Sequence, residues 1–154
     1  MKRLCAVLAA AILLAGCAAP KEVTVTLLYP DAEFLSLQEE TRTVTVTERG
    51  PLWDALAALY EGPYEEGHIA VLSGSLEDIL SVTAEDGLCT VDLSENFVLQ
   101  NTGGSTREGF ILSSIVNALC SLEGIEQVKF NIEGNTAAEY GGHFTLDESF
   151  SPAK

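Results

Sequence analysis

Alternating apolar and polar residues predict two strands in the first third of the chain. Residues 23–29 alternate cleanly, and Pro30-Asp31 ends the run. Residues 42–48 alternate again, with two valines pointing inward between threonines. We expect residues 32–41, between these runs, to form a loop that could hold one more short strand.

A helix is predicted directly after the second strand. Gly50-Pro51 is a favourable start, because proline suits the first helical position, and Asp54 then lies in the first turn. Gly62-Pro63 should end this helix. Residues 64–78 are rich in acid and glycine, and we interpret them as a long connection. The apolar stripe of the helix consists of Leu52, Ala55, Leu56 and Leu59.

A second helix is predicted after a glycine-rich entry. Residues 105–108 (STRE) match a capping box, in which the serine oxygen and the glutamate each satisfy a free backbone N–H. A wide apolar face follows, and Gly124 is a natural C-cap. The face comprises Ile111, Leu112, Ile115, Val116, Ala118, Leu119 and Leu122.

Between the two helices, the dipeptide Asp86-Gly87 predicts a β-hairpin with a type I′ turn. A two-residue loop places six apolar residues on one face, and a slip by one residue would destroy that segregation. The expected pairs are Leu80 with Leu93, Val82 with Val91, and Ala84 with Cys89.

The last third predicts a strand over residues 128–132, and residues 143–146 could add an edge strand. The order is therefore β-β-α-β-β-α-β, with a possible terminal strand. This order favours an α+β fold in which two helices pack on one face of a mixed or antiparallel sheet. The pattern shows one domain and no tandem repeat.

The N-terminus predicts export and lipid attachment. Lys2 and Arg3 precede an apolar run over residues 4–15, which is typical of a signal peptide. Residues 14–17 (LAGC) resemble the lipobox of bacterial lipoproteins, so Cys17 should be the lipid (palmitate) attachment residue. We therefore divide the chain into a signal peptide (1–16), a short tether (17–22), a domain (23–147) and a C-terminal tail (148–154).

Charge limits the partners of such a domain. The chain has a formal net charge of −15, and removing Lys2 and Arg3 with the signal makes it −17. This charge argues against nucleic acid as a partner and against docking flat on anionic lipid, because both need a positive protein surface. We expect the membrane to be reached through the lipid on Cys17, on the extracytoplasmic face.

No residue pattern predicts catalysis, a cofactor or a metal site. The two histidines, His68 and His143, have no second ligand at metal spacing. The serines lie in no nucleophile motif. Paired acids such as Glu65-Glu66 fit a solvated turn. Of the four cysteines, Cys89 and Cys120 would remain for a disulfide or as plain buried thiols.

The loop at residues 101–104 could hold an anion at a helix N-terminus, although it lacks the lysine and spacing of a P-loop. Asn117 is interpreted as a structural amide within an apolar helix face. Trp53 and Tyr60 are expected at the rim or core of the first helix, and exposure of Trp53 would indicate a partner surface.

The order of these segments resembles the GerMN domain of sporulation and spore germination lipoproteins, in a single copy. The resemblance implies a compact α+β domain like the ring-building modules of secretion complexes, and a non-enzymatic role in assembly. It carries over no catalytic residues. The stretches that carry it are 25–31 (VTLLYPD), 60–63 (YEGP), 80–82 (LSV) with 86–87 (DG), 91–97 (VDLSENF), 114–119 (SIVNAL) and 128–134 (VKFNIEG).

The sequence thus predicts a lipid-anchored, non-catalytic cell-envelope module for protein–protein assembly, plausible in sporulation or germination. Its partners would be envelope proteins, with self-association left open. The alternative is a lipoprotein that captures a small molecule or cell-wall fragment, with a pocket formed by the loops at 64–78 and 101–104.

Overall fold

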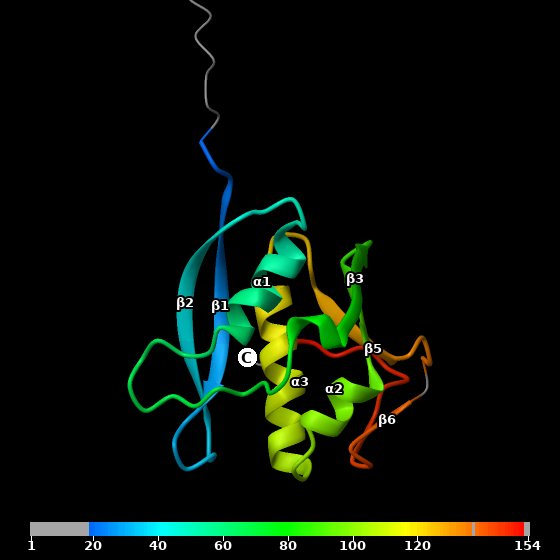
Figure 1. The fold of residues 1–154 in the computed structure, drawn as a ribbon. Coiled ribbons are helices and arrows are strands. Elements are labelled where there is room, and N and C mark those ends of the chain that lie inside the picture. Colours follow the sequence, from blue (N-terminus) through cyan, green and yellow to red (C-terminus); the bar gives the residue numbers. More distant parts are fainter. Residues whose placement is uncertain (1–18, 137, 153–154) are drawn as a thin grey trace, which may run out of the picture.

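The computed structural model describes residues 19–136 and 138–152 (Figure 1). The predicted signal peptide and Cys17 lie outside the described residues. The strands are β1 (Glu22–Pro30), β2 (Leu37–Thr45), β3 (Ile79–Glu85), β4 (Leu88–Leu93), β5 (Gln127–Ile132), β6 (Glu139–Tyr140) and β7 (Phe144–Thr145). The helices are α1 (Pro51–Tyr60), the 3-10 turn η1 (Leu76–Asp78), α2 (Glu95–Gln100) and α3 (Ser105–Cys120).

Strands β1 and β2 form an antiparallel pair that runs from Glu22↔Thr45 to Pro30↔Leu37. The predicted β1 is confirmed. The prediction for the second strand was shifted, because β2 begins at Leu37 and ends at Thr45 instead of covering residues 42–48. The polar first half of β2 gives little periodic signal, and it is strand because β1 offers backbone partners along its whole length.

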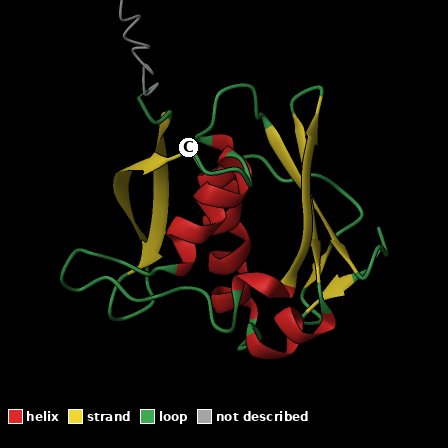
Figure 2. Ribbon diagram, turned by 45° about the horizontal axis from the view of Figure 1, so that its top comes forward, coloured by secondary structure: helices red, strands yellow, loops and turns green. Residues whose placement is uncertain are grey.

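The α+β class is confirmed, and the structure refines the layer arrangement. Helices α1 and α3 lie between the β1–β2 pair and a second sheet of β3, β4 and β5, rather than on one face of a single sheet (Figure 2). Helix α3 packs against β1 on one side and β5 on the other. Its apolar face is wide enough for both, since Ile111, Ile115 and Leu119 are fully buried.

The second sheet has the order β3-β4-β5, with β3 and β4 antiparallel and β4 and β5 parallel. The predicted pairs Val82↔Val91 and Ala84↔Cys89 are confirmed. The predicted pair of Leu80 with Leu93 is wrong. Ile79 is the partner of Leu93, because the register shifts between Ile79 and Ser81. A bulge shifts the alternation by one residue, which leaves Leu80 46% exposed.

The hairpin turn has the predicted chemistry. Asp86 has φ 49° and Gly87 has φ 83°, which is the left-handed pair that a type I′ turn requires.

We predict that Asp86→Ala with Gly87→Ala lowers the free energy of unfolding by about 2 kcal/mol, because alanine disfavours positive φ. Urea titration measures this loss. The control Asp147→Ala with Glu148→Ala alters two exposed acids and should change little; equal stabilities of the two variants would contradict the prediction.

One helix boundary and one whole helix differ from prediction. Helix α3 ends at Cys120 with Ser121 as C-cap, so Leu122 lies beyond it, and Gly124 has a positive φ in the following turn. Helix α2 was not predicted. It begins after Ser94, whose side chain accepts a hydrogen bond from Phe97 N–H. Six residues are too few for a clear helical period, so the cap is the local signal.

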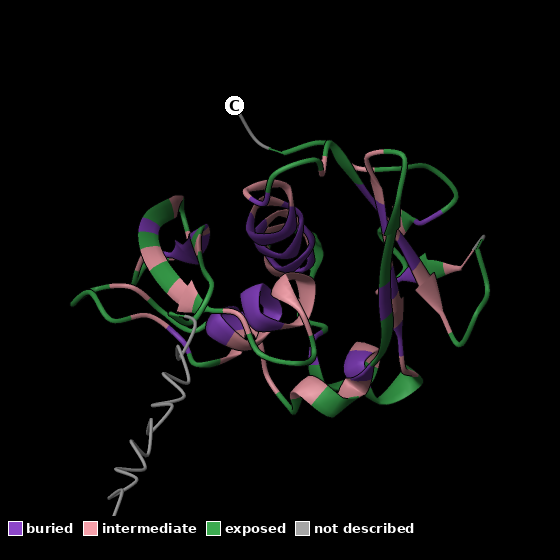
Figure 3. Ribbon diagram, turned by 90° about the horizontal axis from the view of Figure 1, so that it is seen from above, coloured by how far each residue is buried: buried purple, intermediate pink, exposed green. Residues whose placement is uncertain are grey.

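The C-terminal segment adds a small sheet of β6 and β7, which includes part of the predicted edge strand at 143–146. The core lies mainly between the layers, where helices α1 and α3 are largely buried while the outer faces of the sheets are exposed (Figure 3). Cys89 is buried, Cys120 is half-buried, and both are free thiols. Within the part of the chain that the structure describes, no helix is long and apolar enough to cross a membrane.

Candidate functional surfaces

A buried ion cluster joins β2 to the connection after α1; we call Glu40, Arg42, Tyr64 and His68 the Glu40 cluster. Glu40 and Arg42 are two residues apart on β2, so their side chains leave the same face of the strand. The Arg42 guanidinium donates to the Glu40 carboxylate at 2.6 Å, and His68 Nδ1 lies 2.8 Å from it. The backbone N–H of Tyr64 also donates to Glu40. The cluster therefore holds residues 64–68 against β2.

Hydrogen bonding keeps Glu40 ionised although its side chain is only 3% exposed. Burial by itself raises the pKa of Glu40. The hydrogen bonds from Arg42, from the N–H groups of Tyr64 and Glu65, and from His68 outweigh burial and lower the pKa to about 2. A carboxylate held in this way is a poor proton donor or acceptor near neutral pH.

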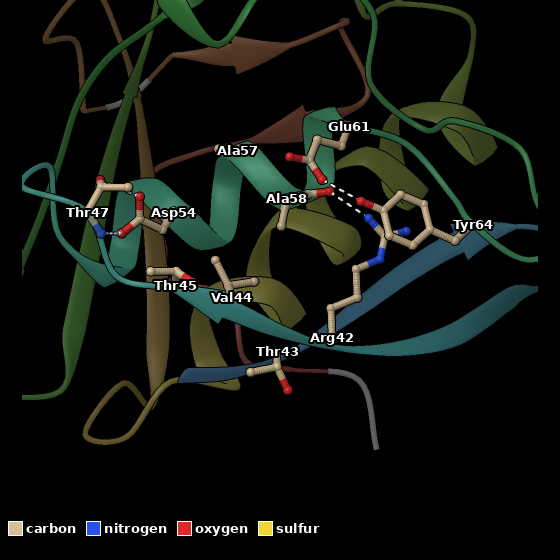
Figure 4. A pocket seen from close by; sticks show the side chains of 10 residues that line it. All are labelled: Arg42, Thr43, Val44, Thr45, Thr47, Asp54, Ala57, Ala58, Glu61 and Tyr64. Carbon is tan, nitrogen blue, oxygen red and sulfur yellow. Dashed lines mark hydrogen bonds between the residues drawn. The ribbon is translucent and has the colours of Figure 1, made fainter. Parts of the chain in front are cut away.

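Arg42 also closes the end of α1. Its guanidinium donates to the carbonyls of Ala58 and Gly62, and it lies 3.6 Å from the centroid of the Tyr64 ring (Figure 4). Next to it, a groove of about 470 Å³ runs between β2 and α1. The lining residues are Arg42, Thr43, Val44, Thr45, Thr47, Asp54, Ala57, Ala58, Glu61 and Tyr64.

At the other end of this groove, Asp54 is 6% exposed. Its carboxylate accepts from the N–H of Thr47 at 2.8 Å and from the hydroxyl at 2.6 Å. The predicted favourable position of Asp54 in the first turn of α1 is thus confirmed, and the side chain also fixes the chain where it enters the helix. Arg42 and Asp54, the two buried or nearly buried charged side chains that border this groove, are thus both hydrogen-bonded within the protein.

A second cluster surrounds the start of α3; we call Gly103, Gly104, Glu108 and His143 the Glu108 cluster. Gly104 is the N-cap and makes no side-chain cap, so the predicted role of Ser105 in a capping box is wrong. Glu108 does bind backbone N–H groups at the helix start, as a capping box requires of its glutamate. Its Oε1 accepts from the N–H groups of Gly103 and Gly104 at 3.3 and 3.2 Å. The loop's tight glycine geometry moves the helix start one residue earlier.

The Glu108 carboxylate therefore binds the backbone N–H groups of the loop that the sequence suggested as an anion site. Its second oxygen lies 2.7 Å from His143 Nδ1, which comes from the β6–β7 connection. Burial raises the pKa of Glu108, but the bonds from His143 and the two glycine N–H groups outweigh it and lower the pKa. The anion at this helix N-terminus is thus a side chain of the protein itself.

The two loops of the predicted ligand pocket do meet, through Asn101. This fully buried amide accepts from Ser73 N–H at 2.8 Å and donates to Ser73 C=O at 3.0 Å. Arg107 donates to Ser73 Oγ at 3.2 Å. A hollow of about 360 Å³ beside them is lined by Phe34, Gly103, Thr106 and Arg107. Asn101 thus ties the loops together and is itself covered.

The other singled-out residues have structural positions. Asn117 is half-buried and donates to the Ser113 carbonyl at 2.8 Å, which confirms it as a structural amide. Trp53 and Tyr60 are half-buried against the core, and the Arg49 guanidinium lies 4.1 Å from the Trp53 ring centroid. Among the described residues, no group of three or more His, Cys, Asp or Glu side chains is placed to hold a metal ion.

Sequence reasoning missed one surface, which we call the α2 groove. It is a hollow of about 440 Å³ between α2 and the chain around the end of β5 and the start of β6. Because α2 was not predicted, this groove could not be predicted either. The weak local signal for it is a leucine, Leu99, in a short segment that begins after a capping serine. The lining residues are Glu95, Val98, Leu99, Ile132, Glu133, Asn135, Ala138 and Glu139.

Solved structures from Bacillus subtilis and Clostridium perfringens share this fold. The tandem GerMN domains of the sporulation protein GerM from Bacillus subtilis match with a TM-score of 0.63 and 21% identity, over 88% of this chain and 46% of that one. This chain thus spans about half of that protein. The first GerMN domain of the same protein matches with a TM-score of 0.59 and 24% identity, over 73% and 84% of the two chains.

A candidate lipoprotein from Clostridium perfringens matches with a TM-score of 0.55 and 20% identity, over 87% of this chain and 91% of that one. Comparison with curated proteins gives no match. The model of the Germane family, described as "Sporulation and spore germination", matches residues 14–138, most of the chain. The chain therefore belongs to this family, whose domain is the GerMN domain.

Proposed function

We propose that this chain is a lipid-anchored, non-catalytic module that assembles or stabilises a protein complex at the cell envelope during sporulation or spore germination. Membership of a sporulation and germination family supports the biological setting. The sequence at residues 14–17 supports the anchor, and the similar fold of a candidate lipoprotein agrees with it.

The observation that carries the non-catalytic role is the use made of the buried acids. Glu40, Asp54 and Glu108 each accept hydrogen bonds from backbone N–H groups of this chain, so they stabilise loops and helix ends. A general acid or base would instead need a free lone pair or proton directed into a cleft, with a pKa near the working pH. The low pKa of Glu40 and of Glu108 favours a structural role for both.

Site-directed photo-crosslinking tests the assembly role. A photoreactive amino acid is placed in turn at exposed positions in the native host during spore formation, for example at Leu35, Leu80 and Leu99. We expect at least one position to form a discrete adduct with another protein in the membrane fraction. If every exposed position stays free of adducts while the protein is present at its normal level, the assembly role is wrong.

Lipid attachment has its own prediction. Cys17→Ala should abolish labelling by palmitate and release the protein from the membrane fraction, because two or more acyl chains are needed for stable anchoring. The circular dichroism spectrum and melting temperature of the domain should not change. Cys120→Ala is the control and should keep both labelling and membrane association. Labelling that persists in Cys17→Ala would contradict the lipobox interpretation.

A further inference from the structure

The α2 groove combines an apolar floor with an acidic rim. Val98, Ile132 and Ala138 are half-buried in the floor. Leu99 borders it on the outer side of α2 with 76% of its surface exposed. Leu99 and the floor together form contiguous apolar surface, and contiguous apolar surface rimmed by polar residues is a mark of interaction sites.

The rim carries charge of one sign. Glu95, Glu133 and Glu139 line the groove with exposed side chains, and its lining contains no basic residue. These three carboxylates would attract a cationic partner and favour its binding. Nucleic acid, anionic lipid and a second copy of this acidic chain would all be repelled by them.

The walls of the groove are held in place by backbone contacts. The chain turns at Glu133-Gly134 with φ 49° and 76°, and Ile132 and Asn135 bond to each other across the turn. The Glu133 carboxylate accepts from Glu95 N–H at 3.1 Å, so it links the turn to the start of α2. Non-glycine residues rarely adopt such a φ. A preorganised groove loses little freedom when a partner binds.

We propose that the α2 groove binds a segment of a partner protein in which an apolar side chain is flanked by lysine or arginine. The apolar side chain covers Leu99 and the floor, and the flanking cations lie against Glu95, Glu133 and Glu139. This inference rests on the proposed assembly function and names the chemistry of the partner.

Binding of a defined probe tests this chemistry. The full-length protein in mild detergent is titrated with a synthetic peptide that carries leucine or phenylalanine between lysines, and with two further peptides. One of these has glutamate for lysine and the other serine for the apolar residue. We expect only the first peptide to bind, and its affinity to fall at least tenfold between 50 and 300 mM salt.

Matched variants localise the binding. Leu99→Ser should weaken binding of the peptide at least tenfold. Leu35→Ser alters a leucine that lies outside the groove and is 80% exposed, and it should not weaken binding. The triple variant Glu95→Gln, Glu133→Gln and Glu139→Gln should also weaken binding at least tenfold. The control triple Glu48→Gln, Glu66→Gln and Glu123→Gln removes the same charge from exposed sites outside the groove. Equal effects of the two triples, or of the two leucine variants, would overturn the proposal.

Crosslinking in the native host then separates this inference from the proposed function. A photoreactive residue at Leu99 should label a segment that mass spectrometry shows to be apolar and flanked by lysine or arginine. Adducts at other positions but none at Leu99 would leave assembly standing and overturn the groove. A Leu99 adduct with a second copy, or with an acidic segment, would also overturn it. Absence of adducts everywhere would instead contradict the assembly role.

Discussion

Replacement of Glu40 by alanine is expected to lower the free energy of unfolding by about 3–5 kcal/mol. Glu40 is 3% exposed and its partner Arg42 is 9% exposed, so the variant would leave a buried guanidinium without its carboxylate. The N–H groups of Tyr64 and Glu65 would also lose their acceptor. A buried donor that is left without a partner costs its full desolvation free energy, which exceeds the net contribution of the lost hydrogen bond to stability.

Urea titration and thermal melting measure this effect, and the melting temperature should fall by roughly 10 °C or more. The matched control is Glu39→Ala, which removes the same side chain from the neighbouring, exposed position of β2. It should change the free energy of unfolding by no more than about 0.5 kcal/mol. Similar losses in the two variants would show that the Glu40 cluster does not stabilise the fold.

The same cluster predicts a pH dependence with a defined sign. The pKa of Glu40 is lowered from 4.5 to about 2, so its ionised form is preferred in the folded state. The contribution, about 3 kcal/mol by linkage, is present above pH 4.5 and disappears as pH falls towards 2. Glu40→Gln cannot titrate at this position. The stability difference between the natural protein and Glu40→Gln should therefore shrink between pH 4.5 and 2; a constant difference would contradict the assigned pKa.

Gly141→Ala is the second substitution with a large expected effect. Gly141 has φ +61°, and a Cβ there would overlap the Glu108 carboxylate. Glu108 is 1% exposed and bound by His143 and by the N–H groups of Gly103 and Gly104, so it cannot move aside without breaking these bonds. We expect a loss of about 3 kcal/mol, in which overpacking adds to the strain of positive φ.

Gly142→Ala provides the control, because Gly142 has φ +77° but open space where a Cβ would lie. It shares the backbone strain and lacks the overlap, so its loss should be only about 1–2 kcal/mol. Chemical denaturation of both variants gives the difference. If Gly142→Ala is as destabilised as Gly141→Ala, backbone strain alone accounts for both and the packing of Glu108 against Gly141 is unimportant.

The predictable parts of the fold carry strong local signals. Pro51 starts α1, and Asp86-Gly87 forms the predicted turn, because each residue restricts its own backbone. The errors have local causes too. The bulge after Ile79 reverses the pattern that had placed Leu80 inside. Helix α2 has six residues, which is shorter than the window in which helical periodicity can be recognised.

The candidate sites were less predictable than the fold, because their members are far apart in sequence. Glu40 and His68 are separated by 28 positions, and Glu108 and His143 by 35. Both histidines were recognised as lacking a metal ligand nearby, and nothing local indicated that each would meet a buried glutamate. The exposure of Leu99 depends equally on how α2 lies against β5 and β6.

The sequence by itself therefore determined the elements whose cause is local: the alternation of β1, the start of α1, the hairpin turn and the broad apolar face of α3. Only the tertiary structure decided how these elements were shared between two sheets, with α3 buried against both. It also decided which acids became buried and bonded and which remained as the rim of the α2 groove. The physical reason is that burial and charge pairing depend on neighbours in space, which periodicity along the chain does not specify.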